Sequence, residues 1–144
     1  VRTYREHILP LHRRLFDRFG TELGRSIHLC GDATRHFRVI RDELHMTTFD
    51  TGYPVNFGAL RRELGPDVHI YGGPPAPLLA EATTAGVRKA TQDVLTSGVM
   101  EGGRFVLREG NNLAPGTPRE NVAAMYETVR SIGTYGEDGK PCMN

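Results

Sequence analysis

The chain has 144 residues, and its 18 lysines and arginines against 17 aspartates and glutamates give a formal net charge of +1. This length is that of one domain with a sizeable core, and the near-neutral balance argues against nucleic acid or an anionic membrane as a partner. The sequence has no stretch of about 18 apolar residues that would span a bilayer, and it starts with neither a secretory signal nor a methionine. We therefore expect a cytoplasmic protein, with this chain as a piece of a longer one.

Apolar residues at spacings of three and four predict an amphipathic helix over residues 4–19, ended by Gly20. Its apolar stripe consists of Ile8, Leu11, Leu15 and Phe19. The other face is basic and is expected to be solvated, with Arg13, Arg14 and Arg18.

Four short apolar segments, each followed by turn residues, predict strands at residues 25–30, 46–49, 68–71 and 104–107. Helices are expected between and after them, at residues 34–44, 56–64, 76–97 (one or two helices) and 117 to about 132. The last helix begins with Thr117 and Glu120 as a capping box and with Pro118 at the first helical position. The polar tail, residues 136–144, is expected to be frayed.

Strands that alternate with helices and are uniformly apolar predict an α/β fold, with a parallel sheet covered by helices. A doubly wound open sheet and a barrel both fit this pattern. A complete eight-fold barrel takes about 250 residues, so this chain would supply about half of one. In either fold the chemistry collects at the carboxyl ends of the strands.

His28 and Cys30 lie two residues apart at the end of the first strand and therefore point to one face. An imidazole beside a thiolate suits a zinc ion, for which Glu109 is the nearest third ligand and Asp50 the next. The alternative is a structural pair, a buried Cys30 and a core histidine. Cys142 lies in the tail, and two cysteines so far apart are expected to be reduced thiols.

The other strand ends carry further candidates. Asp50 follows the second strand and is either a catalytic acid or base or a turn residue. Gly72 and Gly73 let the backbone approach a substrate, although they lack a dinucleotide-binding pattern. Asn111 and Asn112 either donate amide groups to a substrate or hold their loop through backbone bonds.

Five segments together resemble the uroporphyrinogen decarboxylase superfamily, which includes the methylcobamide:thiol methyltransferases. They occur in the family's order and spacing at residues 27–32, 49–52, 64–73, 97–107 and 110–122. The resemblance implies the last four βα units of a (β/α)8 TIM barrel over residues 1–135, followed by a flexible tail over residues 136–144.

The superfamily has two main chemistries. In the methyltransferases a His-x-Cys motif and a later cysteine bind zinc, which activates a thiol that takes a methyl group from a corrinoid. His28-Leu29-Cys30 matches this motif, and the later cysteine falls at about Asn111. The metal-free decarboxylases carry Gly-Asn-Leu-Asp-Pro and Gly-His-Gly motifs, where this chain has Gly72-Gly73-Pro74-Pro75 and Gly110-Asn111-Asn112. The resemblance is therefore closer to the methyltransferase branch.

The leading hypothesis is an enzyme piece for zinc-assisted methyl transfer from a corrinoid, carried by a corrinoid protein, to a small-molecule thiol. In this hypothesis zinc is held at the barrel mouth and the remaining polar residues bind and position the substrate. The roles are: metal ligands His28, Cys30 and Glu109; catalytic residues Asp50 and Asn111; substrate-binding residues Gly72, Gly73 and Asn112.

Two alternatives stay open. The first is a decarboxylase of a tetrapyrrole in porphyrin biosynthesis, without metal or cofactor, in which Asp50 stabilises a protonated ring. The second is a non-catalytic half barrel, whose open sheet edges pair with a second copy or with a missing N-terminal half.

Overall fold

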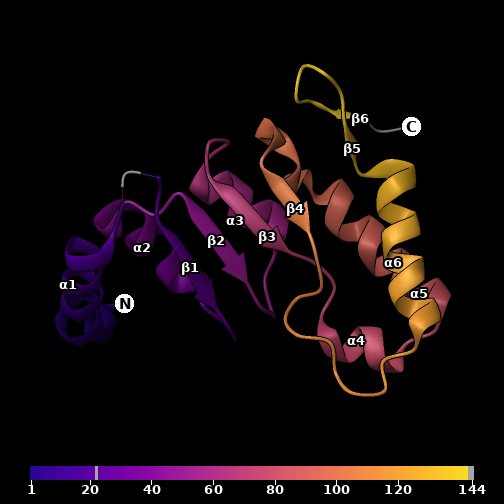
Figure 1. Cartoon of the computed structure of the whole chain (residues 1–144), viewed down its shortest axis with the longest axis horizontal. Helices are drawn as coiled ribbons and strands as arrows, with labels where there is room; N and C mark the ends of the chain where they lie inside the picture. The colour runs from indigo at the N-terminus through magenta and orange to yellow at the C-terminus, as the bar shows by residue number, and fades with distance from the viewer. Residues whose placement is uncertain (22, 143–144) are drawn as a thin grey trace.

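The computed structural model describes residues 1–21 and 23–142. Its main sheet has four parallel strands, which follow one another in space in the order of the sequence (Figure 1). They are β1 (Ser26–Leu29), β2 (Thr48–Thr51), β3 (His69–Gly72) and β4 (Phe105–Leu107). A doubly wound sheet reverses its strand order at a switch point. The unbroken order β1-β2-β3-β4 is instead that of consecutive units in a barrel, so the α/β fold is a part of a TIM barrel.

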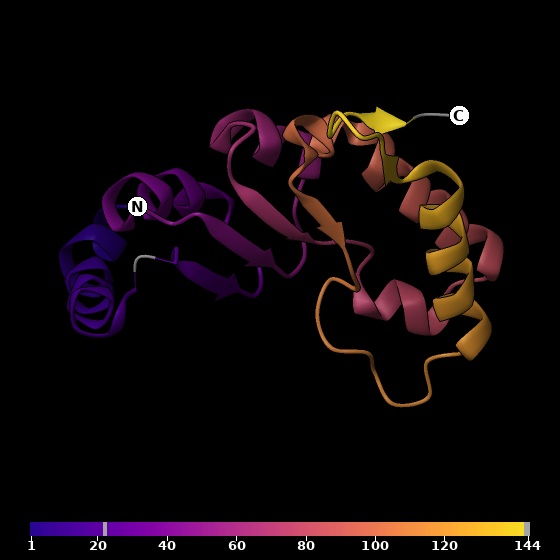
Figure 2. The same cartoon turned by 45° about the horizontal axis from the view of Figure 1, so that its top comes forward.

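Helical segments precede and follow each strand, as the sequence predicts, and the region 76–97 divides into two α-helices and a further turn (Figures 1 and 2). The α-helices are α1 (Leu9–Phe19), α2 (Phe37–Leu44), α3 (Phe57–Leu64), α4 (Ala76–Glu81), α5 (Thr84–Val94) and α6 (Arg119–Ile132). Shorter helical turns are η1 (Tyr4–Ile8), η2 (Thr34–His36), η3 (Leu95–Val99) and η4 (Glu101–Gly103). None of the described helices is long and apolar enough to cross a membrane.

The two faces of the sheet differ in burial. On one face Phe49, Ile70 and Phe105 form a register row across three strands and are almost fully buried. On the other face one row runs across all four strands, and its members are half-buried or exposed: His28, Asp50, Tyr71 and Val106. The expectation that both faces are covered therefore does not hold among the described residues. The open face corresponds to the inside of a barrel.

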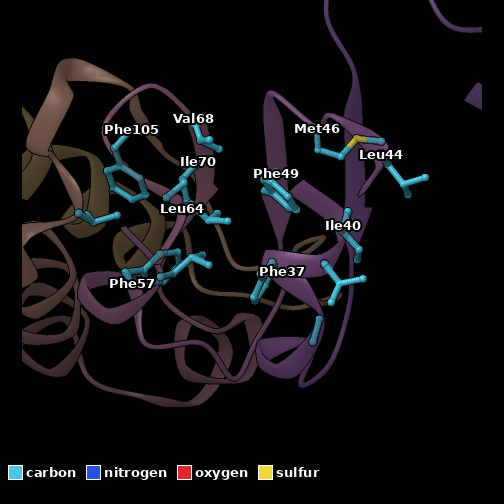
Figure 3. Close-up of a cluster of buried hydrophobic side chains, with 14 of the residues drawn as sticks. Phe37, Ile40, Leu44, Met46, Phe49, Phe57, Leu64, Val68, Ile70 and Phe105 are labelled. Carbon is cyan, nitrogen blue, oxygen red and sulfur yellow. The ribbon is translucent and has the colours of Figure 1, made fainter. Parts of the chain in front are cut away.

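The core fills the space between the closed face of the sheet and the helices α2 and α3 (Figure 3). Phe37 of α2 meets Phe49 edge to face, with 5.6 Å between ring centroids. Phe57 of α3 meets Phe105 in the same way at 5.7 Å. A second cluster joins α4, α5 and α6 through Leu79, Val87, Ala124 and Met125. Burial of these side chains is the main term that holds the helices to the sheet.

The start of α6 differs from the prediction. Asn56 caps α3 in the usual way, because its side chain accepts from the Ala59 backbone N–H at 2.9 Å. The Thr117 hydroxyl, in contrast, donates to the Ala114 carbonyl at 2.7 Å and makes no cap bond. The predicted capping box is therefore wrong, and α6 begins after Pro118.

Helix α1 is present as predicted, but the apolar stripe does not face the core. Leu11, Leu15 and Phe19 are 52%, 55% and 72% exposed, whereas Leu9 between the stripe positions is buried. Figure 1 shows α1 at the β1 end of the sheet, beyond the first strand. All the exposed large hydrophobic residues of the described chain lie at the two ends of the sheet, before β1 or from β4 onward: Val1, Ile8, Leu11, Leu15, Phe19, Leu23, Val106, Leu113 and Tyr126.

The segment after α6 forms a short antiparallel hairpin of β5 (Thr134–Tyr135) and β6 (Pro141–Cys142). The Tyr135 hydroxyl accepts from the Phe105 N–H at 3.2 Å and donates to the Phe105 carbonyl at 3.3 Å. The hairpin is thus connected to β4 through Tyr135, which directly precedes the predicted tail. Residues 143 and 144, which belong to the predicted flexible tail, lie outside the described residues.

The buried guanidinium of Arg61 links α3 to the backbone next to β3, η3 and β4. The Arg61 side chain is 1% exposed, and burial lowers the pKa of its guanidinium. Its three nitrogens donate to four backbone carbonyls at 2.7–3.0 Å, those of Gly65, Val68, Val99 and Arg104. Arg61 thereby pairs carbonyl groups before β3, at the end of η3 and before β4, and the Arg104 carbonyl also accepts from the Ile70 N–H.

We predict that Arg61→Ala lowers the free energy of unfolding by about 3 kcal/mol or more, because it removes the hydrogen bonds and leaves buried carbonyls unpaired. Urea unfolding followed by circular dichroism measures the change. Arg62→Ala is the matched control, because Arg62 is the exposed neighbour on the same helix. Equal shifts of the two unfolding midpoints would contradict the role assigned to Arg61.

Candidate active site

The candidate site lies on the open face of the sheet, near the carboxyl ends of its strands. His28 of β1 stands opposite Asp50 of β2 in the parallel register. Asp50 Oδ2 lies 2.9 Å from His28 Nδ1. Because a carboxylate only accepts, Nδ1 carries the proton of this bond. The second ring nitrogen, Nε2, lies 2.9 Å from Cys30 Sγ. The thiol of Cys30, the imidazole of His28 and the carboxylate of Asp50 therefore form one continuous line of contacts.

The exposure of these side chains decides between the interpretations that the sequence leaves open. The His28 side chain is 43% exposed and Cys30 is exposed, so neither belongs to the core. Asp50 lies within β2 and accepts hydrogen bonds from His28 of β1 and from Arg108 after β4, so it is not a turn residue.

Arg108, which the sequence analysis missed, connects the end of β4 to this line of contacts. Its Nη1 donates to Asp50 Oδ2 at 2.9 Å, and its Nη2 donates to Glu109 Oε1 at 3.1 Å. Asp50 thus accepts from both His28 and Arg108. Glu109, the expected third metal ligand, is bonded to Arg108. A basic residue directly after a strand, next to an acidic one, was the only local signal for this bridge.

Asn111 reaches the same sulfur from the loop that follows β4. Its Nδ2 donates to Cys30 Sγ at 3.6 Å. The loop is held near β3 because the Gly110 N–H donates to the Pro74 carbonyl at 2.8 Å. Asn112, the next residue, is exposed. The structure therefore brings Asn111 to the candidate site and leaves Asn112 in the solvent-exposed part of the loop.

Gly72 and Gly73 are buried among protein atoms instead of lying open to a substrate. A Cβ on Gly73 would lie 2.0 Å from the Arg108 carbonyl oxygen, and one on Gly72 would lie 2.6 Å from the Thr51 hydroxyl. Both distances are far below a van der Waals contact. The absence of side chains lets the ends of β3 and β4 approach closely, which places Arg108 beside Asp50.

The side chains at this site supply part of the ligand set that a zinc ion needs. A zinc site takes at least three protein ligands, and His28 and Cys30 are two suitable donors, with Asp50 on the outer nitrogen of the imidazole as second-shell partners usually are. Within residues 1–21 and 23–142 no group of three or more histidine, cysteine, aspartate or glutamate side chains is placed to hold a metal ion. The described donors do not complete a zinc site, and zinc binding by the chain stays a prediction.

Asn111 offers a direct test of this donor count. We predict that Asn111→Cys adds a third donor beside Cys30 and His28 and raises zinc affinity by about 100-fold, in the range that a change of one metal-site residue produces. Competition with a chromophoric chelator measures the affinity, and elemental analysis measures the zinc bound per chain.

Asn112→Cys is the matched control, because it adds a thiol one residue away at an exposed position. Equal gains in zinc affinity for the two variants would show that Asn111 does not lie at the site. Near-stoichiometric zinc in the wild-type chain would show that two described donors are enough.

Comparison with known families places this arrangement in context. Residues 1–132 match the family described as uroporphyrinogen decarboxylase (URO-D). The chain belongs to the uroporphyrinogen decarboxylase family. The match covers all six α-helices and the four parallel strands, and it leaves out the β5–β6 hairpin.

Two similar proteins come from Methanosarcina mazei. A methylated-thiol–coenzyme M methyltransferase is 29% identical over 130 residues, which cover 89% of this chain and 33% of that protein. A solved structure of a methyltransferase aligns with a TM-score of 0.71 at 17% identity, over 90% of this chain and 36% of that one. The structural likeness confirms the fold. The chain spans about a third of the length of either protein, as a part of a barrel does.

Proposed function

We propose that this chain carries part of the reaction centre of an enzyme that transfers a methyl group to a thiol. The observation that carries the proposal is the contact of 2.9 Å between Cys30 Sγ and His28 Nε2 at the carboxyl ends of the strands. Membership of the uroporphyrinogen decarboxylase family and the similarity to a methylated-thiol–coenzyme M methyltransferase support it.

The chemistry of thiol methylation fits the side chains of the site. The substrate thiol must lose its proton as the sulfur–carbon bond forms. The His28 imidazole is a suitable proton acceptor for a thiol within hydrogen-bond reach. Asp50 holds His28 in the tautomer that leaves Nε2 free, and its carboxylate stabilises the imidazolium that results. Arg108 donates to the same carboxylate oxygen, Oδ2, and helps to fix the orientation of Asp50.

The substrates and partners are also part of the proposal. We propose a small-molecule thiol as acceptor and a corrinoid, carried by a corrinoid protein, as methyl donor. The open face of the sheet supports the approach of a large methyl donor. On this face His28, Tyr71 and Val106 are less buried than the row on the opposite face, which contains Phe49, Ile70 and Phe105.

Methyl transfer from methylcobalamin to a small thiol such as 2-mercaptoethanol tests the proposal. The decay of the methylcobalamin absorbance and the thioether product, identified by mass spectrometry, are the two measurements. We expect His28→Gln to lower kcat by about 100-fold or more, because it removes the proton acceptor. His69→Gln is the control and is expected to keep the wild-type rate, because His69 lies at the start of β3, at the amino end of the strands. Equal rates for wild type and His28→Gln would contradict the proposal.

Decarboxylation of a tetrapyrrole is the second candidate, favoured by the family to which the chain belongs. It needs a carboxylate that is free to stabilise a protonated ring, whereas Asp50 already accepts from His28 and Arg108. The geometry therefore favours methyl transfer. Release of CO2 from a carboxylated tetrapyrrole at an unchanged rate in Cys30→Ala would establish the second candidate instead.

A further inference from the structure

The surroundings of Cys30 are those of a reactive thiol more than those of a structural one. Two nitrogen groups converge on its sulfur, His28 Nε2 at 2.9 Å and Asn111 Nδ2 at 3.6 Å. The residue is exposed, so a reagent reaches the sulfur from solvent. Reactive cysteines lie in partly exposed places with basic or cationic neighbours, whereas structural cysteines are buried and inert. Cys142, in β6, is less exposed and has no such contact among the described hydrogen bonds.

The imidazole that contacts Cys30 is held in place at both of its nitrogens. Asp50 accepts from Nδ1, Arg108 donates to Asp50, and Glu109 accepts from Arg108. The charges of Asp50, Arg108 and Glu109 alternate in sign. A nucleophile, a base and a carboxylate that orients the base are the three parts that activate a cysteine or serine in covalent catalysis. Here they come from two adjacent strands, β1 and β2, and the loop after β1.

The same contacts argue against a role of Cys30 as a metal ligand. Glu109 is bonded to Arg108 and lies outside the pair of donors. The group that approaches the sulfur from the loop after β4 is an amide N–H, which donates a hydrogen bond and does not bind a cation. Among the described residues, one hydrogen-bond donor, the Asn111 amide, therefore lies beside the sulfur where a zinc site would have a third ligand.

We propose that Cys30 is a metal-free nucleophile that accepts a methyl or other small alkyl group on its own sulfur. The inference rests on the proposed function for the identity of the group transferred, and it names the protein's thiol as the first acceptor. The donor is an alkyl compound R–X with X as leaving group, such as an alkyl sulfonate, a sulfonium ion or an alkyl corrinoid.

The step balances without an oxidant or reductant. An electron pair of Cys30 Sγ forms the bond to the alkyl carbon, and the bond from that carbon to X breaks, with its electron pair leaving on X. The proton of Sγ passes to His28 Nε2, and Asp50 stabilises the resulting imidazolium. The product is an S-alkylcysteine at position 30.

Alkylation rates of the chelator-treated protein test the inference. Iodoacetamide and methyl p-toluenesulfonate are the probes, and peptide mass spectrometry follows Cys30 and Cys142 in the same sample. We expect Cys30 to react at least about tenfold faster than Cys142 and to gain a methyl group from the sulfonate, because a neighbouring base increases the nucleophilicity of a thiol. Cys142 serves as the internal reference for reagent and conditions.

Variants separate the effect of the imidazole from that of simple exposure. His28→Gln should lower the rate at Cys30 by about tenfold or more and leave Cys142 unchanged, because glutamine is not a base. His69→Gln is the matched control: His69 lies on β3 near Arg104, at the amino end of the strands, and should change neither rate. Far-ultraviolet circular dichroism confirms that both variants fold.

Two results would overturn the inference. The first is an equal rate at Cys30 in wild type and His28→Gln. The second is complete protection of Cys30 by stoichiometric zinc chloride alone, which would make it a metal ligand. These results are distinct from failure of the proposed function: rapid methyl transfer to 2-mercaptoethanol with an unreactive Cys30 rejects only the nucleophile, whereas rapid S-alkylation without transfer to any thiol rejects only the proposed function.

Discussion

The Asp50 carboxylate is the group on which the rest of the site depends. One oxygen, Oδ2, accepts from His28 on β1 and from Arg108 after β4, so it joins three parts of the sheet edge. The parallel register places His28 directly beside Asp50. A slip of one residue would turn His28 toward the helices, because side chains alternate between the faces of a strand. The register of the sheet therefore fixes both the proton position on the imidazole and the place of the guanidinium.

The two faces of the sheet divide stability from chemistry. The row that contains Phe49, Ile70 and Phe105 packs on α2 and α3 and contributes to the core. The row that contains His28 and Asp50 carries the polar groups and has no such cover among the described residues. Arg61 lies on the core side and pairs backbone carbonyls near strand starts, away from the reacting groups. Substitutions on the core face are thus expected to change stability, and substitutions on the open face are expected to change the chemistry of the site.

The features that could be predicted from the sequence are local ones. The four strands and the helices follow from periodicity and turn residues, and the shared face of His28 and Cys30 follows from the two-residue period of a strand. The partnership of His28 with Asp50 depends on strand register, which a single sequence does not specify.

The sequence does not indicate the role of Arg108, because its partner Asp50 is 58 residues away in the sequence. Periodicity identified α1 but could not show whether another element covers its apolar stripe, and the Thr117 hydroxyl found a nearer acceptor than the helix start. In each case a tertiary contact decided the outcome.

The uncovered stripe of α1 has a consequence for the colloidal behaviour of the chain. A formal net charge of +1 supplies little electrostatic repulsion between molecules, while Leu11, Leu15 and Phe19 present apolar surface. Salting-out anions such as sulfate strengthen the association of such surfaces. The buffer anion is therefore expected to affect any association between copies of this chain through α1.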